Sequence, residues 1–164
     1  MPPFTANDPS GLPDLAQMLS MSGLEFMQAL RDGKISGAPI AKTLNFVIDQ
    51  VEPGRVSFRG RPEFDAMNPM GGVHGGWYGA ILDSALGCAV MTRVPKGSIY
   101  TTLEFKVNIT RAIHLGTDVI AESTCQHAGR STAVANAEIR GVENGKLYAT
   151  GSTTCMIMTP DPNR

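Results

Sequence analysis

The stretch from Asn68 to Thr92 constrains the fold more than any other part of the chain. From Gly71 onward its one formal charge is Asp83, among residues that are otherwise small or apolar. Its first part is rich in glycine, and apolar residues then recur at helical spacing: Trp77, Ile81, Ala85 and Cys88. This pattern predicts a helix buried on most sides. Because burying an unpaired charge is costly, we expect Asp83 to have a partner or a task.

The predicted helix has two unlike faces. Asp83 shares one face with small residues, which are Gly76, Gly79, Ala80 and Gly87. The bulkier set of Trp77, Ile81, Ala85 and Cys88 lies roughly opposite. We expect the bulky face to pack on a sheet and the small face to border a cleft or another subunit. A structural role for Asp83, as a loop cap or an arginine partner, is the alternative.

Composition narrows the class of protein. The 164 residues suffice for one core, and a formal net charge of −1 favours neither nucleic acid nor a membrane surface as a partner. The glycines, the histidine and the aspartate between Gly71 and Thr92 argue against a membrane span. No basic amino-terminal segment precedes an apolar run, so we expect a cytoplasmic protein. The cysteines lack metal-ligand spacing, and we expect free thiols and no metal: Cys88, Cys125 and Cys155.

The chain divides into a short amino-terminal part and one main domain. Met1–Pro13 reads as a loose arm, and Ser22–Gly33 as a short amphipathic helix that Ser22 caps and Gly33 ends. Lys34–Ala41 reads as a linker. We therefore predict an arm with a short helix over residues 1–40 and the main domain over residues 41–160.

The main domain is predicted to be α+β. Leu44–Val51 and Arg55–Arg61 flank a Glu-Pro-Gly turn, which predicts a hairpin before the helix. Four strand segments with short turns follow the helix, and we expect them to form an antiparallel meander: Ile99–Arg111, Asp118–Gln126, Ser131–Arg140 and Lys146–Met158. The expected fold is an antiparallel sheet wrapped around one long helix.

The helix also raises a question of geometry. Gly71–Gly76 permits a tight approach to the first N–H groups of the helix, which favour a developing anion. Gly75 and Asp83 are eight residues apart, about 12 Å along a helix. A general base and an oxyanion donor must both act within about 3 Å of one carbonyl group. If both residues act, Gly75 of one subunit must therefore meet Asp83 of another.

Three segments together resemble a known family. They are Asn68-Pro-Met-Gly-Gly-Val-His74-Gly75-Gly76, Leu82–Ala85 and Thr102–Arg111. These segments are similar to those of the PaaI-like hotdog-fold acyl-CoA thioesterases, a family related to phenylacetic acid degradation. The resemblance extends over roughly residues 41–158. It implies a hotdog sheet around the helix, acyl-CoA as substrate without a further cofactor, obligate dimers and often homotetramers.

The resemblance also implies roles for individual residues. Asp83 matches the catalytic carboxylate and Gly75 the backbone donor that polarises the thioester carbonyl. Asn68 matches a polar residue that lines the site, and His74 the histidine that orients it. Thr102 stands where relatives have a Ser or Thr near the attacking water. Asn68 has a structural alternative, an Asx turn before Pro69, and the carboxylate's role as nucleophile or as general base stays open.

Contacts to coenzyme A are expected from a second group of residues: Gly76, Gly129, Arg130 and Arg111. Ala112 departs from the family, which usually has proline after the position of Arg111. The acyl pocket has candidates that do not distinguish aromatic from aliphatic groups: Met67, Met70, Trp77, Tyr78 and Leu86. Two other functions compete, a hotdog enoyl-CoA hydratase or dehydratase and an acyl-CoA-binding sensor without turnover. The His-Gly-Gly motif followed by Asp83 argues against the first, and the retained carboxylate argues mildly against the second.

Overall fold

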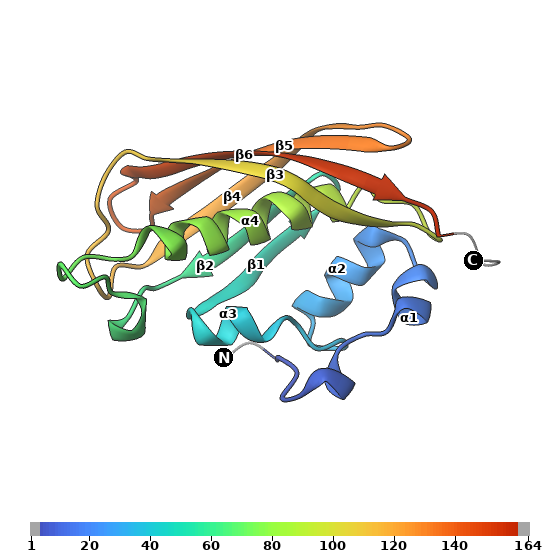
Figure 1. Cartoon of the computed structure of the whole chain (residues 1–164), viewed down its shortest axis with the longest axis horizontal. Helices are drawn as coiled ribbons and strands as arrows, with labels where there is room; N and C mark the ends of the chain where they lie inside the picture. Colours follow the sequence, from blue (N-terminus) through green and yellow to red (C-terminus); the bar gives the residue numbers. More distant parts are fainter. Residues whose placement is uncertain (1–3, 161–164) are drawn as a thin grey trace.

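One antiparallel sheet curves over one long helix (Figure 1). The computed structural model describes residues 4–160, and the central helix is α4, Gly75–Met91. The strands are β1 (Phe46–Glu52), β2 (Arg55–Gly60), β3 (Ile99–Ile109), β4 (Val119–Ala128), β5 (Thr132–Gly141) and β6 (Leu147–Met158). Alternation and turn residues predict all six, and the arrangement confirms the hotdog fold.

The order of the strands corrects one expectation. Across the sheet the order is β1-β2-β4-β5-β6-β3, so the four strands after the helix do not form a meander. β2 pairs with one side of β4 and β5 pairs with the other, which leaves β3 to pair with the free side of β6. Thr102 lies opposite Cys155 in this pairing, and Ile109 lies opposite Ala149. As a result β3 is an edge strand.

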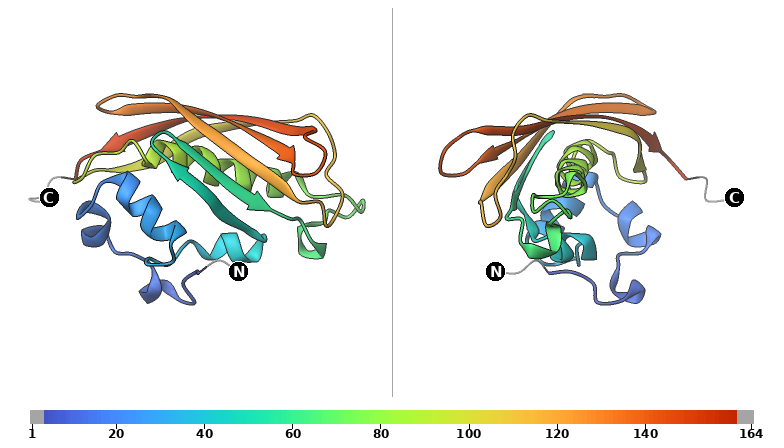
Figure 2. Two further views of the ribbon diagram at one scale, coloured as in Figure 1. Left: turned by 180° about the vertical axis from the view of Figure 1, so that it is seen from behind. Right: turned by 60° about the vertical axis from the view of Figure 1, so that its left-hand side comes forward.

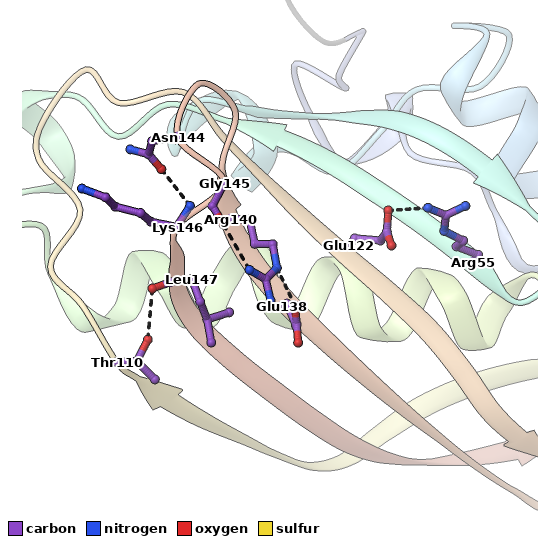
Figure 3. Close-up of polar contacts among 9 residues, drawn as sticks. All are labelled: Arg55, Thr110, Glu122, Glu138, Arg140, Asn144, Gly145, Lys146 and Leu147. Atoms are coloured by element: carbon purple, nitrogen blue, oxygen red, sulfur yellow. Dashed lines mark hydrogen bonds and ion pairs between the residues drawn. The ribbon is translucent and has the colours of Figure 1, made fainter.

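The two faces of the sheet differ in polarity. Along β5 buried residues alternate with exposed ones, and the buried ones face α4. On the outer face, Arg55 of β2 pairs with Glu122 of β4 at 2.7 Å, and Arg140 pairs with Glu138 at 2.7 Å (Figure 3). These exposed pairs contribute little stability, about 0–1 kcal/mol each. They keep the outer face solvated while the inner face holds the core.

The start of α4 is fixed by two aromatic side chains. Trp77 is buried, and its Nε1–H donates to the carbonyl oxygen of Leu44 at 2.8 Å. The buried Tyr78 hydroxyl accepts from the backbone N–H of Ile113 at 2.7 Å. Both bonds satisfy polar atoms inside the core, where an unpaired one would cost about 1–3 kcal/mol. The entrance of the helix is thereby held against the strands.

An amino-terminal helical segment lies on the side of α4 away from the sheet (Figure 2). It contains η1 (Pro9–Gly11), α1 (Leu15–Leu19), α2 (Gly23–Arg31) and α3 (Pro39–Thr43), and η2 (Phe64–Ala66) lies later, before α4. α2 confirms the predicted short helix and begins with a capping box between Ser22 and Glu25. The supposed arm and linker are more ordered than expected: they hold η1 and the start of α3, and Thr5 bridges Gly37.

Gly23 shows how closely α2 packs. A side chain there would overlap the carbonyl of Met91 at the end of α4, and the N–H of Gly23 donates to the carbonyl of Val94 at 3.0 Å. Within residues 4–160 no helix is long and apolar enough to cross a membrane.

Candidate functional site

Helix α4 and edge strand β3 lie side by side in opposite directions. The small residues on one face of α4 meet the inward side chains of β3 in four successive pairs: Gly75 with Ile109, Gly79 with Phe105, Asp83 with Thr102, and Gly87 with Tyr100. The expected division of the helix is therefore confirmed in outline. The small face borders an edge strand, so it lies where a second subunit could approach.

Asp83 is half-buried in the middle of this row. The hydroxyl of Thr102 donates to its Oδ1 over a long 3.4 Å, and within residues 4–160 no Lys, Arg or His forms an ion pair with it. Desolvation raises the pKa of the Asp83 carboxyl, and the bond from Thr102 only partly opposes that shift. A carboxylate with one weak partner and a raised pKa is suited to take a proton or to attack a carbonyl.

The entrance of α4 offers the N–H of Gly75 as a donor. His74 is the N-cap: its Nδ1 accepts from the N–H of Gly76 at 2.8 Å, and its carbonyl accepts from the N–H of Trp77 at 3.0 Å. The N–H of Gly75 has no acceptor in the described part of the chain, and Gly75 is exposed. This N–H, at the positive end of the helix dipole, can bind an oxyanion. The N–H of Gly76, an expected contact to coenzyme A, is already occupied.

Asn68 shapes the loop before the helix. Its Oδ1 accepts from the N–H of Met70 at 2.9 Å and from that of Gly72 at 3.1 Å, which is the turn-forming role considered as its alternative. No hydrogen bond joins Asn68 to His74 among residues 4–160. The structure thus gives both residues a local role at the entrance of α4.

Two of the expected coenzyme A contacts lie far apart in one chain. Arg111 follows β3, and its N–H donates to the carbonyl of Tyr148 at the start of β6. Arg130 lies in the turn before Thr132, which pairs with Met156 near the other end of β6. Eight strand residues separate these ends, about 26 Å. Both arginines are exposed, and Gly129 is tied into its turn by a bond to Thr132.

The acyl-pocket candidates differ widely in burial. Trp77, Tyr78 and Leu86 are core residues with 2% or less of their surface exposed, whereas Met70 is 94% exposed. None of these four belongs to the pairs that join α4 to β3. Their apolar character in sequence marked the core. Of the β3 side chains that do border Asp83's face, the sequence singled out Thr102 but not Tyr100, Phe105 or Ile109.

Cys88 and Gly87 depart from the predicted division of the helix into a buried face and an open face. Cys88, assigned to the bulky face, is half-buried, whereas Gly87, assigned to the open face, is buried beneath Tyr100. Burial raises the pKa of the Cys88 thiol to about 12, so it stays protonated at neutral pH. Among the residues described, no group of His, Cys, Asp or Glu could hold a metal ion.

Comparison with known proteins identifies relatives of similar sequence and structure. The family model of the thioesterase superfamily matches residues 70–148. A mutant of the phenylacetic acid degradation protein PaaI from Thermus thermophilus is 27% identical, over 72% of this chain and 97% of that one, with a TM-score of 0.66. A phenylacetic acid degradation-related protein from Ralstonia eutropha, described as a thioesterase, is 26% identical, over 80% of this chain and 98% of that one, with a TM-score of 0.72.

A third likeness concerns the fold alone. A hypothetical thioesterase from Streptococcus pneumoniae, whose structure was solved with coenzyme A, is 24% identical. The alignment covers 73% of this chain and 91% of that one, with a TM-score of 0.65. No curated protein sequence matches the chain significantly.

Proposed function

Because the chain belongs to the thioesterase superfamily, with a hotdog fold, and is a thioester hydrolase, we propose that its substrate is an aryl- or fatty acyl-CoA. The products are the free acid and coenzyme A, and the reaction uses no metal or redox cofactor. The coenzyme A in the Streptococcus pneumoniae structure supports this substrate class. The observation that carries the proposal is the pair formed by the free Gly75 N–H and the half-buried Asp83 on one helix face.

One chain holds only half of each site. Gly75 and Asp83 belong to the same straight helix, about 12 Å apart, too far to act on one carbonyl. Both residues, however, contact β3, whose outer side has no partner strand within residues 4–160. A second copy that pairs with this edge brings its own Gly75 toward Asp83. The proposed active unit is therefore a dimer.

The edge strand has the character of an interface. Leu103 is 57% exposed, Phe105 44% and Ile109 49%, although β3 is the second-longest strand of the sheet. Long edges with exposed apolar side chains invite pairing with another strand, and soluble proteins usually protect them. Pairing β3 with β3 of a second copy about a two-fold axis covers these side chains and closes the open edge.

The contacts along β3 define the register of this pairing. Gly75 sits against Ile109 and Asp83 against Thr102, so the two meet across the interface when Thr102 lies opposite Ile109 of the second copy. The bulge at Leu103 adds one residue to the strand. When this extra residue is included in the register, the two-fold axis passes between the two copies of Lys106. The Cα atoms of residues opposite each other are then about 4.5–5.5 Å apart.

The same pairing gathers the coenzyme A contacts. In this register the Arg111 end of one β3 lies beside the Thr101 end of the other. Thr101 is opposite Met156, which in turn neighbours the turn that carries Arg130. Three strand spacings then separate Arg111 of one copy from Arg130 of the other, about 14 Å. Two cations that are remote within a chain can thus hold the phosphates of one coenzyme A.

The proposed chemistry follows from these positions. The Gly75 N–H binds the thioester oxygen and stabilises the negative charge that develops on it. Asp83 of the other copy either removes a proton from water as the water attacks the carbonyl carbon, or attacks that carbon itself, with Thr102 holding the carboxylate or the water. In the second case the thiolate leaves a mixed anhydride between the acyl group and Asp83, which water then hydrolyses to the free acid and the carboxylate. The carbon–sulfur bond breaks, and the thiolate takes up a proton to leave as coenzyme A. His74 and Asn68 act as positioning residues for the Gly75 N–H.

Thiol release over a panel of aryl- and fatty acyl-CoAs tests the proposal. We expect turnover by the parent and a loss of about 10²–10⁴ in kcat for Asp83→Asn. Glu122→Gln, which removes a carboxylate from the outer face of the sheet (Figure 3), should behave like the parent. Undiminished turnover by Asp83→Asn would reject the assigned role. Binding without release would favour the sensor, and hydration of an enoyl-CoA would favour the hydratase.

A further inference from the structure

The small-residue face of α4 is open at one end and closed at the other. We define this face as Gly76, Gly79, Ala80, Asp83, Ser84 and Gly87. From Gly76 to Ser84 its residues are exposed or half-buried, but Gly87 is buried although it lies in the middle of the same face. The closure therefore begins one helical turn beyond Asp83.

Tyr100 makes this closure. It lies on the inner side of β3, one inward position before Thr102, and its hydroxyl and ring edge are the nearest atoms to Gly87. A Cβ at residue 87 would overlap the Tyr100 hydroxyl, so glycine at this position lets the Tyr100 side chain lie against the helix. Beyond it, the Met91 backbone is covered by Gly23 at the start of α2. Strand, helix and amino-terminal segment thus meet past Asp83.

The surroundings of Tyr100 show that it is placed for its bulk. Desolvation raises the pKa of its hydroxyl well above the usual value, and no hydrogen bond from a residue in the range 4–160 opposes that shift. The contact that the described chain gives Tyr100 at this end of the face is therefore its packing against Gly87. The ring fills the gap between β3 and α4 that Gly87 leaves.

We infer that Tyr100 is the specificity-determining residue of the acyl site and forms its end wall. The inference rests on the proposed function, since it assumes that the thioester carbonyl lies at Asp83. From there the acyl group follows the open part of the small-residue face toward Gly87. Four residues of helix separate Asp83 from the wall, about 6 Å, which admits an acyl group on the scale of one aromatic ring or a short chain.

The test is a chain-length profile. kcat/KM is measured with acetyl-, butyryl-, hexanoyl-, octanoyl-, lauroyl-, benzoyl- and phenylacetyl-CoA for the parent, Tyr100→Phe and Tyr100→Ala. We expect the parent and Tyr100→Phe, which keeps the ring, to prefer the short or aromatic groups. Tyr100→Ala should raise the lauroyl-to-butyryl ratio of kcat/KM by about tenfold or more, because several methylenes gain contacts that the wall denied.

Each outcome decides one claim. If the parent hydrolyses none of these thioesters, the proposed function is wrong, and the end wall loses the premise on which it rests. A parent that hydrolyses them, with a Tyr100→Ala profile that stays unchanged, overturns the end wall alone, as does a parent that prefers lauroyl-CoA. Thermal melting checks folding, and Tyr100→Leu, which keeps an apolar side chain, replaces Tyr100→Ala if that variant does not fold; its ratio should rise in the same direction.

Discussion

Replacing Gly75 by proline removes one hydrogen-bond donor with little other change. Gly75 is the first residue of α4, a position that proline favours, and its N–H has no acceptor within residues 4–160. His74 has φ −63° and ψ 138°, a conformation that a residue before proline adopts readily. The nearest atom to an added Cβ is Cδ1 of Ile109 at 3.6 Å, an ordinary contact. The stability of the fold should therefore change by no more than about 0.5 kcal/mol.

The effect on catalysis should be much larger. Loss of one oxyanion donor typically lowers kcat by about 10²–10³, or about 2.7–4 kcal/mol of transition-state stabilisation. Gly75→Ala is the matched control, because it adds the same Cβ and keeps the N–H, and we expect it to stay within a few fold of the parent. Thiol release and thermal melting are measured for both variants. If Gly75→Pro melts like Gly75→Ala and turns over equally fast, Gly75 is not the donor.

Four further predictions follow from the same geometry. Desolvation raises the pKa of Asp83 in the folded protein above its value in the unfolded chain, so ionised Asp83 destabilises the fold at any pH above the folded-state pKa. Asp83→Asn should therefore melt at a higher temperature than the parent at neutral pH, and this difference should vanish in acid, where Asp83 is protonated. For the same reason kcat/KM of the parent should rise with pH along an acid limb above the usual aspartate pKa of about 3.9, and the limb should be missing from the variant's residual activity. His74→Ala should lose about 1 kcal/mol of stability, a fall in Tm of about 2–4 °C, whereas His74→Asn keeps an N-cap acceptor and most of that stability; equal melting of the two would contradict the cap. Lys106→Cys should form a disulfide-linked dimer on a non-reducing gel, and Asn108→Cys on the same outer face should not, while the reverse result would refute the register.

Local patterns in the sequence predicted most of the elements. The Glu-Pro-Gly turn joins two strands that the structure contains, and Ser22 caps the short helix as expected. The single charge in an apolar helix indicated Asp83, because the cost of burying a charge is visible without any structure. These features depend on neighbours in the chain, which a sequence shows directly.

Features that depend on distant segments were not predicted. β3 lies at the edge because β2 pairs with one side of β4, so β3 pairs with β6 instead. The alternation of residues within a strand does not reveal which strand it will pair with. Tyr100 reads as an ordinary strand residue until its contact with Gly87 is known. The burial of Trp77 and Tyr78 in the core, where they seemed candidates for a pocket, likewise depends on strands that lie elsewhere in the sequence.

The central claim is that each active site combines Gly75 of one copy with Asp83 of another. Gly75→Pro and Asp83→Asn proteins, each inactive alone, can be unfolded, mixed in equal amounts and refolded together. Random pairing makes half of the dimers mixed, and each mixed dimer holds one intact site, so the mixture should recover about one quarter of the parent's thiol release per chain. A mixture that forms mixed dimers, shown by differently tagged chains that co-purify, yet stays as inactive as its components would contradict the claim.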